Sequence, residues 1–157
     1  MKYLEKALKL AMVLSSAILA IVTFLQVIMR FFFKMPVAWG QDIIRLSFVY
    51  LVFLGAAYCL KTNDHLNIDI IFSMVSNKTG KILNILINFV LLGFFIFLLF
   101  YGIQFSKTGI TQKAPYTAIP MIYYYASIPI SAIFLILYDI EIIINQFKEI
   151  KDGETKW

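Results

Sequence analysis

His65 is the only histidine of the chain, and its chemistry must be considered first because it lies beside Asp64 and near Asp69. A metal site would need further ligands at suitable spacing, and a catalytic dyad would need a positioned nucleophile. Ser73 and Ser76 follow closely, but nothing around them indicates an activated hydroxyl. We therefore predict no catalytic or metal-binding residue, and interpret His65 as a loop residue that forms a hydrogen bond or caps a helix.

Cys59 is the only cysteine, so the chain has neither an internal disulfide nor a C-x-x-C pair for redox or metal chemistry. A cluster of histidine, cysteine and carboxylate side chains is also missing from the sequence. The sequence therefore disfavours an enzyme, and we predict no cofactor.

Polar residues inside the apolar runs carry hydroxyl or amide groups and no central charge. Ion-coupled transporters usually place ionisable groups or broken helices near the membrane midplane. Hydroxyl and amide groups more often join neighbouring helices, and Asn84 and Asn88 share one helical face at i, i+4. Sodium sites can be built from carbonyl and hydroxyl oxygens alone, so transport by this chain is disfavoured but not excluded. The residues concerned are Ser15, Ser16, Thr23, Gln26, Asn84, Asn88, Gln104 and Ser127.

The composition indicates that membrane-spanning helices carry these residues. Hydrophobic residues make up 61% of the chain and charged residues 15%, whereas soluble domains average about 45–50% and about 25%. The 14 basic residues give a net charge of +5 but are scattered between apolar runs. We therefore predict contact with membrane lipid and no binding of nucleic acid.

The chain contains four apolar runs near the length of about 20 residues that a helix needs to cross a bilayer. We place the spans at about 10–30, 42–61, 81–106 and 119–142, within one all-α transmembrane domain of residues 1–157. The first run is too long for a cleaved signal and ends at Arg30 beside an aromatic cluster. Pro120 and Pro129 can kink the fourth span, which continues as an amphipathic helix.

Residues 65–79 are too few to span a membrane. Apolar side chains recur there at three- and four-residue spacing, which is typical of one helical face. We predict a short interfacial amphipathic helix on the cytoplasmic surface. The alternative is an extension of the third span that bends at Gly80.

The distribution of basic residues predicts the orientation. Nine lysines lie on the side that holds both termini and the loop between the second and third spans, and five basic residues lie on the other side. Because basic residues favour the cytoplasmic side, we expect both termini in the cytoplasm. The five are Arg30, Lys34, Arg45, Lys107 and Lys113.

Charged residues at the borders of the spans are candidates for structural pairing. Arg30, Asp42 and Arg45 lie at the outer border, and the Asp42 carboxylate suits a helix N-terminus. At the opposite border, Lys78 and Lys81 precede the third span, and Asp139 and Glu141 follow the fourth. We expect these sets to pair across helices or with a partner subunit. The alternative is that each group is solvated independently by lipid headgroups.

Residues 26–71 resemble the small membrane subunit of tripartite ATP-independent periplasmic (TRAP) transporters. An arginine closes the first span, a Pro, a Trp and an acidic residue open the second, a Gly lies in its middle, and a His followed by an acidic residue comes after it. A Pro at the start of the fourth span extends the resemblance to nearly the whole chain. The family commonly has Glu where this chain has Asp42. The matching residues are Arg30, Pro36, Trp39, Asp42, Gly55, His65, Asp69 and Pro120.

The resemblance implies a sodium-driven secondary transporter for organic acids, such as sialic acid or C4-dicarboxylates, in the bacterial inner membrane. It implies two partners, namely a large polytopic membrane subunit that holds the substrate and ion sites and a periplasmic substrate-binding protein. The chain itself would be a non-catalytic scaffold. A small self-sufficient transporter or channel is the alternative. Our candidates for structural or subunit-interface roles are Arg30, Trp39, Asp42, Arg45, Gly55, His65, Asp69 and Pro120.

Overall fold

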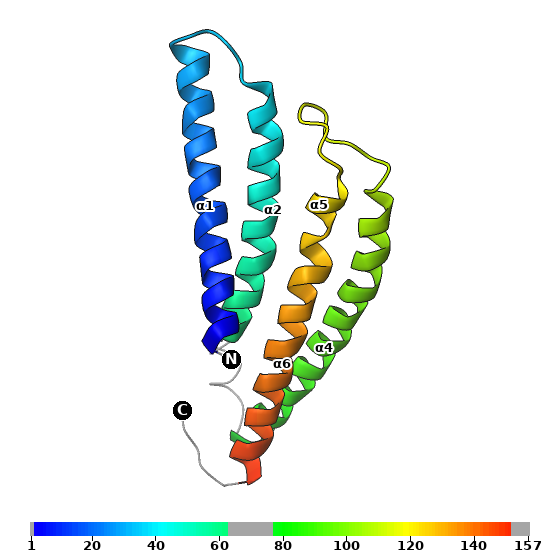
Figure 1. Ribbon diagram of the computed structural model, residues 1–157. Helices are drawn as coiled ribbons and strands as arrows, with labels where there is room; N and C mark the ends of the chain where they lie inside the picture. The colour runs from blue at the N-terminus through cyan, green and yellow to red at the C-terminus, as the bar shows by residue number, and fades with distance from the viewer. Residues whose placement is uncertain (1, 63–76, 152–157) are drawn as a thin grey trace.

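The computed structural model describes residues 2–62 and 77–151, which are almost entirely helical (Figure 1). Lys113 and Pro120 form an isolated β-bridge in the loop before the last helices. The all-α prediction is confirmed. The helices are α1 (Lys2–Phe31), α2 (Ala38–Lys61), α4 (Asn77–Thr108), α5 (Ile122–Tyr125) and α6 (Ser127–Lys151).

Four helical segments are long and apolar enough to cross a membrane, as predicted. They are Leu4–Phe31, Ala38–Lys61, Leu83–Thr108 and Ile122–Lys148. The fourth differs from its predicted range, because residues 119–121 belong to the preceding loop. Helix α6 continues to Lys151, which agrees with the predicted helical extension of the fourth span.

The helices stand side by side in the order α1, α2, α6, α4 (Figure 1). Helix α2 packs against α1 on one side and α6 on the other, and α6 packs in turn against α4. The last span is therefore inserted between the second and the third. A buried cluster joins the elements: Leu8, Leu54, Ala57, Leu60, Phe95, Leu135 and Tyr138. Because α1 and α4 are the outer helices of the row, each has a side that no other described helix covers.

A break at Ala126 separates α5 from α6. Pro129 has no N–H to donate to the carbonyl of Tyr125, and its ring would collide with that carbonyl in a continuous helix. The Ser127 hydroxyl instead donates to the Tyr124 carbonyl over 2.7 Å. The helix is thus interrupted three residues before Pro129, whereas Pro120 lies in the loop, outside the helix.

The loop between α4 and α5 folds back on itself like a small hairpin. The Ala114 N–H donates to the Ile119 carbonyl over 2.8 Å, and the Met121 N–H to the Gln112 carbonyl over 2.9 Å. Ala118 has φ 55°, in the left-handed region, so the chain reverses at this point. These bonds hold the loop tip, residues 115–118, in one conformation.

The third long helix, α4, begins four residues before the predicted third span of 81–106. Helix α4 begins at Asn77 and passes through Gly80 without a break. Residues 77–79 of the predicted interfacial segment therefore belong to α4. The rest of that segment lies outside the described residues.

Candidate functional site

Asp42 makes the densest set of polar contacts at the end of the row where α2 begins. One carboxylate oxygen, Oδ2, accepts hydrogen bonds from the Tyr116 N–H (2.9 Å), the Thr117 N–H (2.8 Å) and the Thr117 hydroxyl (3.0 Å). The Tyr124 hydroxyl donates to the Asp42 backbone carbonyl over 3.1 Å. We call Asp42, Tyr116, Thr117 and Tyr124 the Asp42 latch. It fastens the first turns of α2 to the α4–α5 loop and to α5.

These donors explain how Asp42 can be only 1% exposed. A buried carboxylate is costly unless donors surround it, and two backbone N–H groups with one hydroxyl supply them here. We expected the Asp42 carboxylate to lie at the N-terminus of its own helix, but it binds groups of a distant loop instead. Val37 is the N-cap residue of α2, and no side chain caps this helix. Asp42 lies more than one turn inside α2, so its carboxylate points to the loop.

Two further contacts join neighbouring helices near the same end. The Gln26 amide of α1 donates to the Val37 carbonyl over 3.1 Å, and a Cβ on Gly40 would lie 2.6 Å from the Gln26 Nε2. A larger residue at position 40 would therefore displace the Gln26 side chain from its present position. The Tyr50 hydroxyl of α2 donates to the Tyr123 carbonyl of α5 over 3.0 Å.

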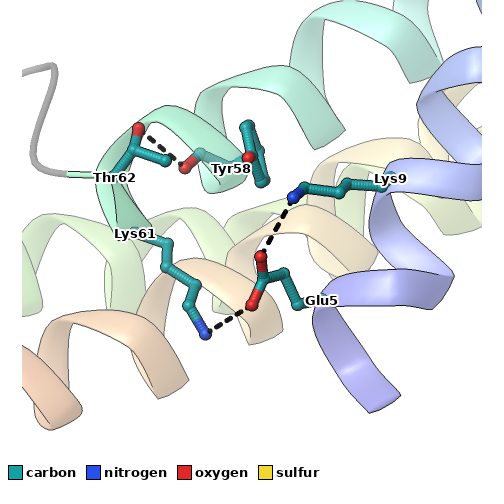
Figure 2. Close-up of polar contacts among 5 residues, drawn as sticks. All are labelled: Glu5, Lys9, Tyr58, Lys61 and Thr62. Carbon is teal, nitrogen blue, oxygen red and sulfur yellow. Dashed lines mark hydrogen bonds and ion pairs between the residues drawn. The ribbon is translucent and has the colours of Figure 1, made fainter. Parts of the chain in front are cut away.

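A charged cluster joins α1 and α2 at the opposite end (Figure 2). The Glu5 carboxylate lies 3.2 Å from the Lys9 ammonium and 3.3 Å from the Lys61 ammonium. Lys9 lies over the Tyr58 ring and Lys61 over the Tyr138 ring, each 5.1 Å from the ring centroid. Sequence reasoning missed this cluster. The i, i+4 spacing of Glu5 and Lys9 was visible, but nothing in the sequence showed that Lys61 joins them.

The expected helix contact at Asn88 is confirmed. Its amide donates to the Gln146 side-chain oxygen over 3.1 Å, which ties α4 to α6, and to the Asn84 carbonyl over 2.9 Å. Asn88 is fully buried. The polar side chains of the apolar runs thus connect helices at this point.

Asp139 is fully buried in α6, one residue after Tyr138 and so at the level of the Lys61 end of α2. Within residues 2–62 and 77–151, neither of its carboxylate oxygens has a hydrogen-bond partner. The expected pairing with Lys78 or Lys81 falls on side chains outside the described set, and the ion pairs found among described residues do not include Asp139 or Glu141.

Comparison with known proteins identifies the family. Residues 19–149 match the family model of the DctQ component of tripartite ATP-independent periplasmic transporters. The chain belongs to this family. TRAP small subunits are transporter components and not enzymes, so this one is a multi-pass membrane protein of a transporter.

Three relatives show how far the similarity extends. A protein of Haemophilus influenzae named as a TRAP transporter small permease protein is 30% identical, over 96% of this chain and 92% of its own length. The sialic acid TRAP transporter small permease protein SiaQ of Vibrio cholerae is 24% identical over 86% of this chain and 78% of its own. The C4-dicarboxylate TRAP transporter small permease protein DctQ of Vibrio cholerae is 27% identical over 66% and 45%.

Among the border residues whose side chains the structure describes in this TRAP small subunit, Asp42 alone has several hydrogen-bond partners. Arg30 at the end of α1 and Arg45 in α2 are both exposed, and the ion pairs found in the described chain involve neither. Trp39 is 46% exposed at the start of α2. Within the described chain, the Asp42 carboxylate is thus held by loop donors, and pairing of these border residues with a partner subunit stays a prediction.

The remaining candidate residues of the TRAP small subunit have simpler surroundings. Gly55 lies in the middle of α2, and a Cβ there would meet Met12 of α1 at 3.8 Å, an ordinary contact. Pro120 pairs with Lys113 in the β-bridge of the α4–α5 loop. His65 and Asp69 lie outside the described residues.

The described part of the chain contains no group of three or more His, Cys, Asp or Glu residues that could hold a metal ion. An open groove of about 490 Å³ runs along α4 and is lined mainly by apolar side chains. Its lining residues are Leu98, Tyr101, Gly102, Gln104, Phe105, Thr108 and Ile128.

Proposed function

We propose that this TRAP small subunit is the non-catalytic scaffold of a sodium-coupled secondary transporter that imports an organic acid of the sialic acid or C4-dicarboxylate type. A larger polytopic membrane subunit holds the substrate and sodium sites, and a periplasmic binding protein delivers the acid. The chain forms one transmembrane domain in the bacterial inner membrane, with both termini in the cytoplasm.

The use of the polar groups carries this proposal. The polar side chains of the spans that have partners in the described chain bind groups of this same chain. Asp42 binds loop amides, Asn88 binds Gln146, and Gln26 binds the Val37 carbonyl. Groups that hold helices together in this way are not free to replace the hydration shell of an ion or a carboxylate.

The relatives support the substrate class and the large partner. Sialic acid and C4-dicarboxylates, named for SiaQ and DctQ, are both organic acids. The sialic acid TRAP transporter permease protein SiaT of Haemophilus influenzae is 24% identical over 62% of this chain, but the match covers only 17% of SiaT. A segment like this chain thus occurs within a much larger permease, which favours a role beside a large membrane subunit.

Charge and geometry support the orientation. Helix α1 begins and α6 ends at the same end of the row (Figure 1). Eight of the 14 basic residues lie in the helix ends found there, namely Lys2, Lys6, Lys9, Lys61, Lys78, Lys81, Lys148 and Lys151. The positive-inside bias places that end in the cytoplasm. The Asp42 latch then lies at the periplasmic border.

Reconstitution in proteoliposomes tests the proposal. The chain, the large subunit of the same transporter and their binding protein are combined, and uptake of a labelled organic acid is measured with an inward sodium gradient. We expect uptake from the complete set, and none from liposomes that contain this chain as their only membrane protein.

Two controls sharpen the assay. Replacing the sodium gradient with an equal potassium gradient removes the driving force, and uptake is then expected to stop. Sodium-dependent uptake by the chain alone would contradict the scaffold role and support the self-sufficient transporter instead.

A further inference from the structure

The turn between α1 and α2 forms a tip at one corner of the row (Figure 1). Residues 30–36 are all exposed, and Trp39 in the first turn of α2 is exposed as well. A contiguous apolar surface of this kind marks a site of contact. We call residues 30–39 the α1–α2 tip. Its most exposed large apolar side chains, between 63% and 81% exposed, are Phe31, Phe32, Phe33 and Met35.

The aromatic rings of the tip point to different sides. The Phe32 N–H donates to the Ile28 carbonyl over 2.9 Å, so the last helical turn of α1 extends to Phe32. Successive side chains of a helix are about 100° apart, so Phe31 and Phe32 leave the helix in different directions. They are 74% and 81% exposed. A partner helix covers one side of such a tip, whereas lipid molecules surround it, and this favours lipid as the contact.

The length of α1 indicates the level of the tip in the bilayer. The 20 residues from Leu10 to Met29 are uncharged and separate the exposed Lys9 from the exposed Arg30. At about 1.5 Å per residue they measure about 30 Å, which is the thickness of the hydrocarbon core. Arg30 then lies at the border, and the tip lies in the headgroup layer beyond it, which is about 5 to 7 Å thick. Aromatic side chains are enriched at this level of a membrane.

The exposed charge of the tip is positive only. Arg30 and Lys34 are exposed, and the ion pairs found in the described chain include neither. Asp42 is the one acidic residue between Lys9 and Lys61 in the sequence, and its carboxylate is buried and held by the α4–α5 loop. Phospholipid phosphates supply anions at the level of the tip.

Lys34 adds a conformational indication. Its φ is 52°, in the left-handed region, which glycine and asparagine adopt more readily than lysine does. The chain therefore places a cation at this turn in spite of a less favourable backbone conformation. Such a position is a reason to expect a role for the side chain.

The other loop at this end of the row lacks the same combination. The exposed large apolar side chains of the α4–α5 loop are Ile110 and Tyr116. Polar residues separate them, and the Tyr116 N–H is bound to Asp42. A contiguous apolar surface with cations at its border thus belongs to the α1–α2 tip and not to this loop.

We propose that the α1–α2 tip binds phospholipid, with Arg30 and Lys34 on the lipid phosphates and the aromatic rings among the glycerol groups and the upper acyl chains. Binding of this kind fixes the depth of α1 in the bilayer. For Arg30 it favours contact with headgroups over pairing with a partner subunit. The proposal goes beyond the scaffold function and depends neither on it nor on the orientation of the chain.

Trp39 reports on the surroundings of the tip. Trp157→Phe leaves Trp39 as the only tryptophan, and the purified chain is reconstituted in vesicles of phosphatidylcholine and phosphatidylglycerol. We expect lipids brominated near the glycerol end of the acyl chain to quench the Trp39 fluorescence most, and dissolved acrylamide to quench it weakly. Strong quenching by acrylamide, or strongest quenching by bromine at the end of the acyl chain, overturns the proposal.

The same fluorescence tests the two cations. At equal mole fraction, brominated phosphatidylglycerol should quench Trp39 about twofold more than brominated phosphatidylcholine, because cations enrich anionic lipid around them. In the double variant Arg30→Gln, Lys34→Gln the two lipids should quench equally. The matched control is Lys6→Gln, Lys148→Gln, which removes two exposed cations at the opposite end of the row and keeps the wild-type ratio. An unchanged ratio in the first variant contradicts phosphate binding.

Photo-crosslinking in the assembled transporter distinguishes lipid from protein at the tip. A photoreactive phenylalanine analogue replaces Phe32, and the chain is coexpressed with the large subunit and the binding protein. We expect position 32 to crosslink to phospholipid and to neither protein. A crosslink to the large subunit or to the binding protein overturns the proposal and leaves the scaffold function intact.

Discussion

Asp42 shows how one residue fixes a loop at the membrane border. Its carboxylate receives two backbone N–H bonds and one hydroxyl bond from the tip of the α4–α5 loop, and it is almost fully buried. The sequence pointed to Asp42 as a border charge, but its partners lie more than 70 residues away in a loop with no signal of its own. Arg45, which looked equally important, is exposed.

Removal of the latch should loosen the loop. In Asp42→Ala the N–H groups of Tyr116 and Thr117 lose their acceptor, and we expect a loss of about 1 to 3 kcal/mol of stability. The measurement is thermal unfolding of the purified chain in detergent. Gln41→Ala, at an exposed neighbouring position, serves as the control and should unfold at the wild-type temperature. An unchanged unfolding temperature for Asp42→Ala would show that the latch contributes nothing.

At the scale of the element, the sequence predicts where the helices span the membrane but not which helices pack against each other. Long uncharged runs reveal where helices cross a membrane, because the bilayer requires about 20 apolar residues. Lipid is as apolar as leucine, however, so hydrophobicity does not show which face of a helix meets another helix. The insertion of α6 between α2 and α4 depends on local details such as the fit of Gly102 against Pro129.

Enlarging Gly102 should separate α4 from α6. In Gly102→Leu the new side chain collides with Ile128 and Pro129, and we expect a loss of about 1 to 3 kcal/mol. Gly93→Leu is the matched control on the same helix, and its stability should change by less than about 0.5 kcal/mol. Thermal unfolding and size-exclusion chromatography of the purified chain compare the two. Equal behaviour of both variants would contradict the close α4–α6 contact.

At the scale of the whole molecule, the helices form a row whose two ends differ in charge. The end where α1 begins and α6 ends carries most of the described lysines and the Glu5–Lys61 ion pair, and the other carries the Asp42 latch. Counting the basic residues on each side of the spans predicted this asymmetry, since it depends only on their positions along the sequence. The row itself was not predictable, because its order depends on tertiary contacts.

Cys59 provides a test of the orientation. It is half-buried near the Lys61 end of α2, which we place in the cytoplasm. A membrane-impermeant thiol reagent should label it in inverted vesicles and not in intact spheroplasts. Lys34→Cys in a Cys59→Ser background, with the new thiol in the exposed turn after α1, should show the reverse. Labelling of Cys59 from outside would invert the proposed topology.

The central claim is that this TRAP small subunit holds a partner and carries no solute. Equilibrium binding of ²²Na⁺ and of a labelled organic acid, measured on the purified chain and on its complex with the large subunit, tests it most directly. We predict saturable binding by the complex and none by the chain alone. Stoichiometric binding of either ligand to the chain alone would contradict the claim.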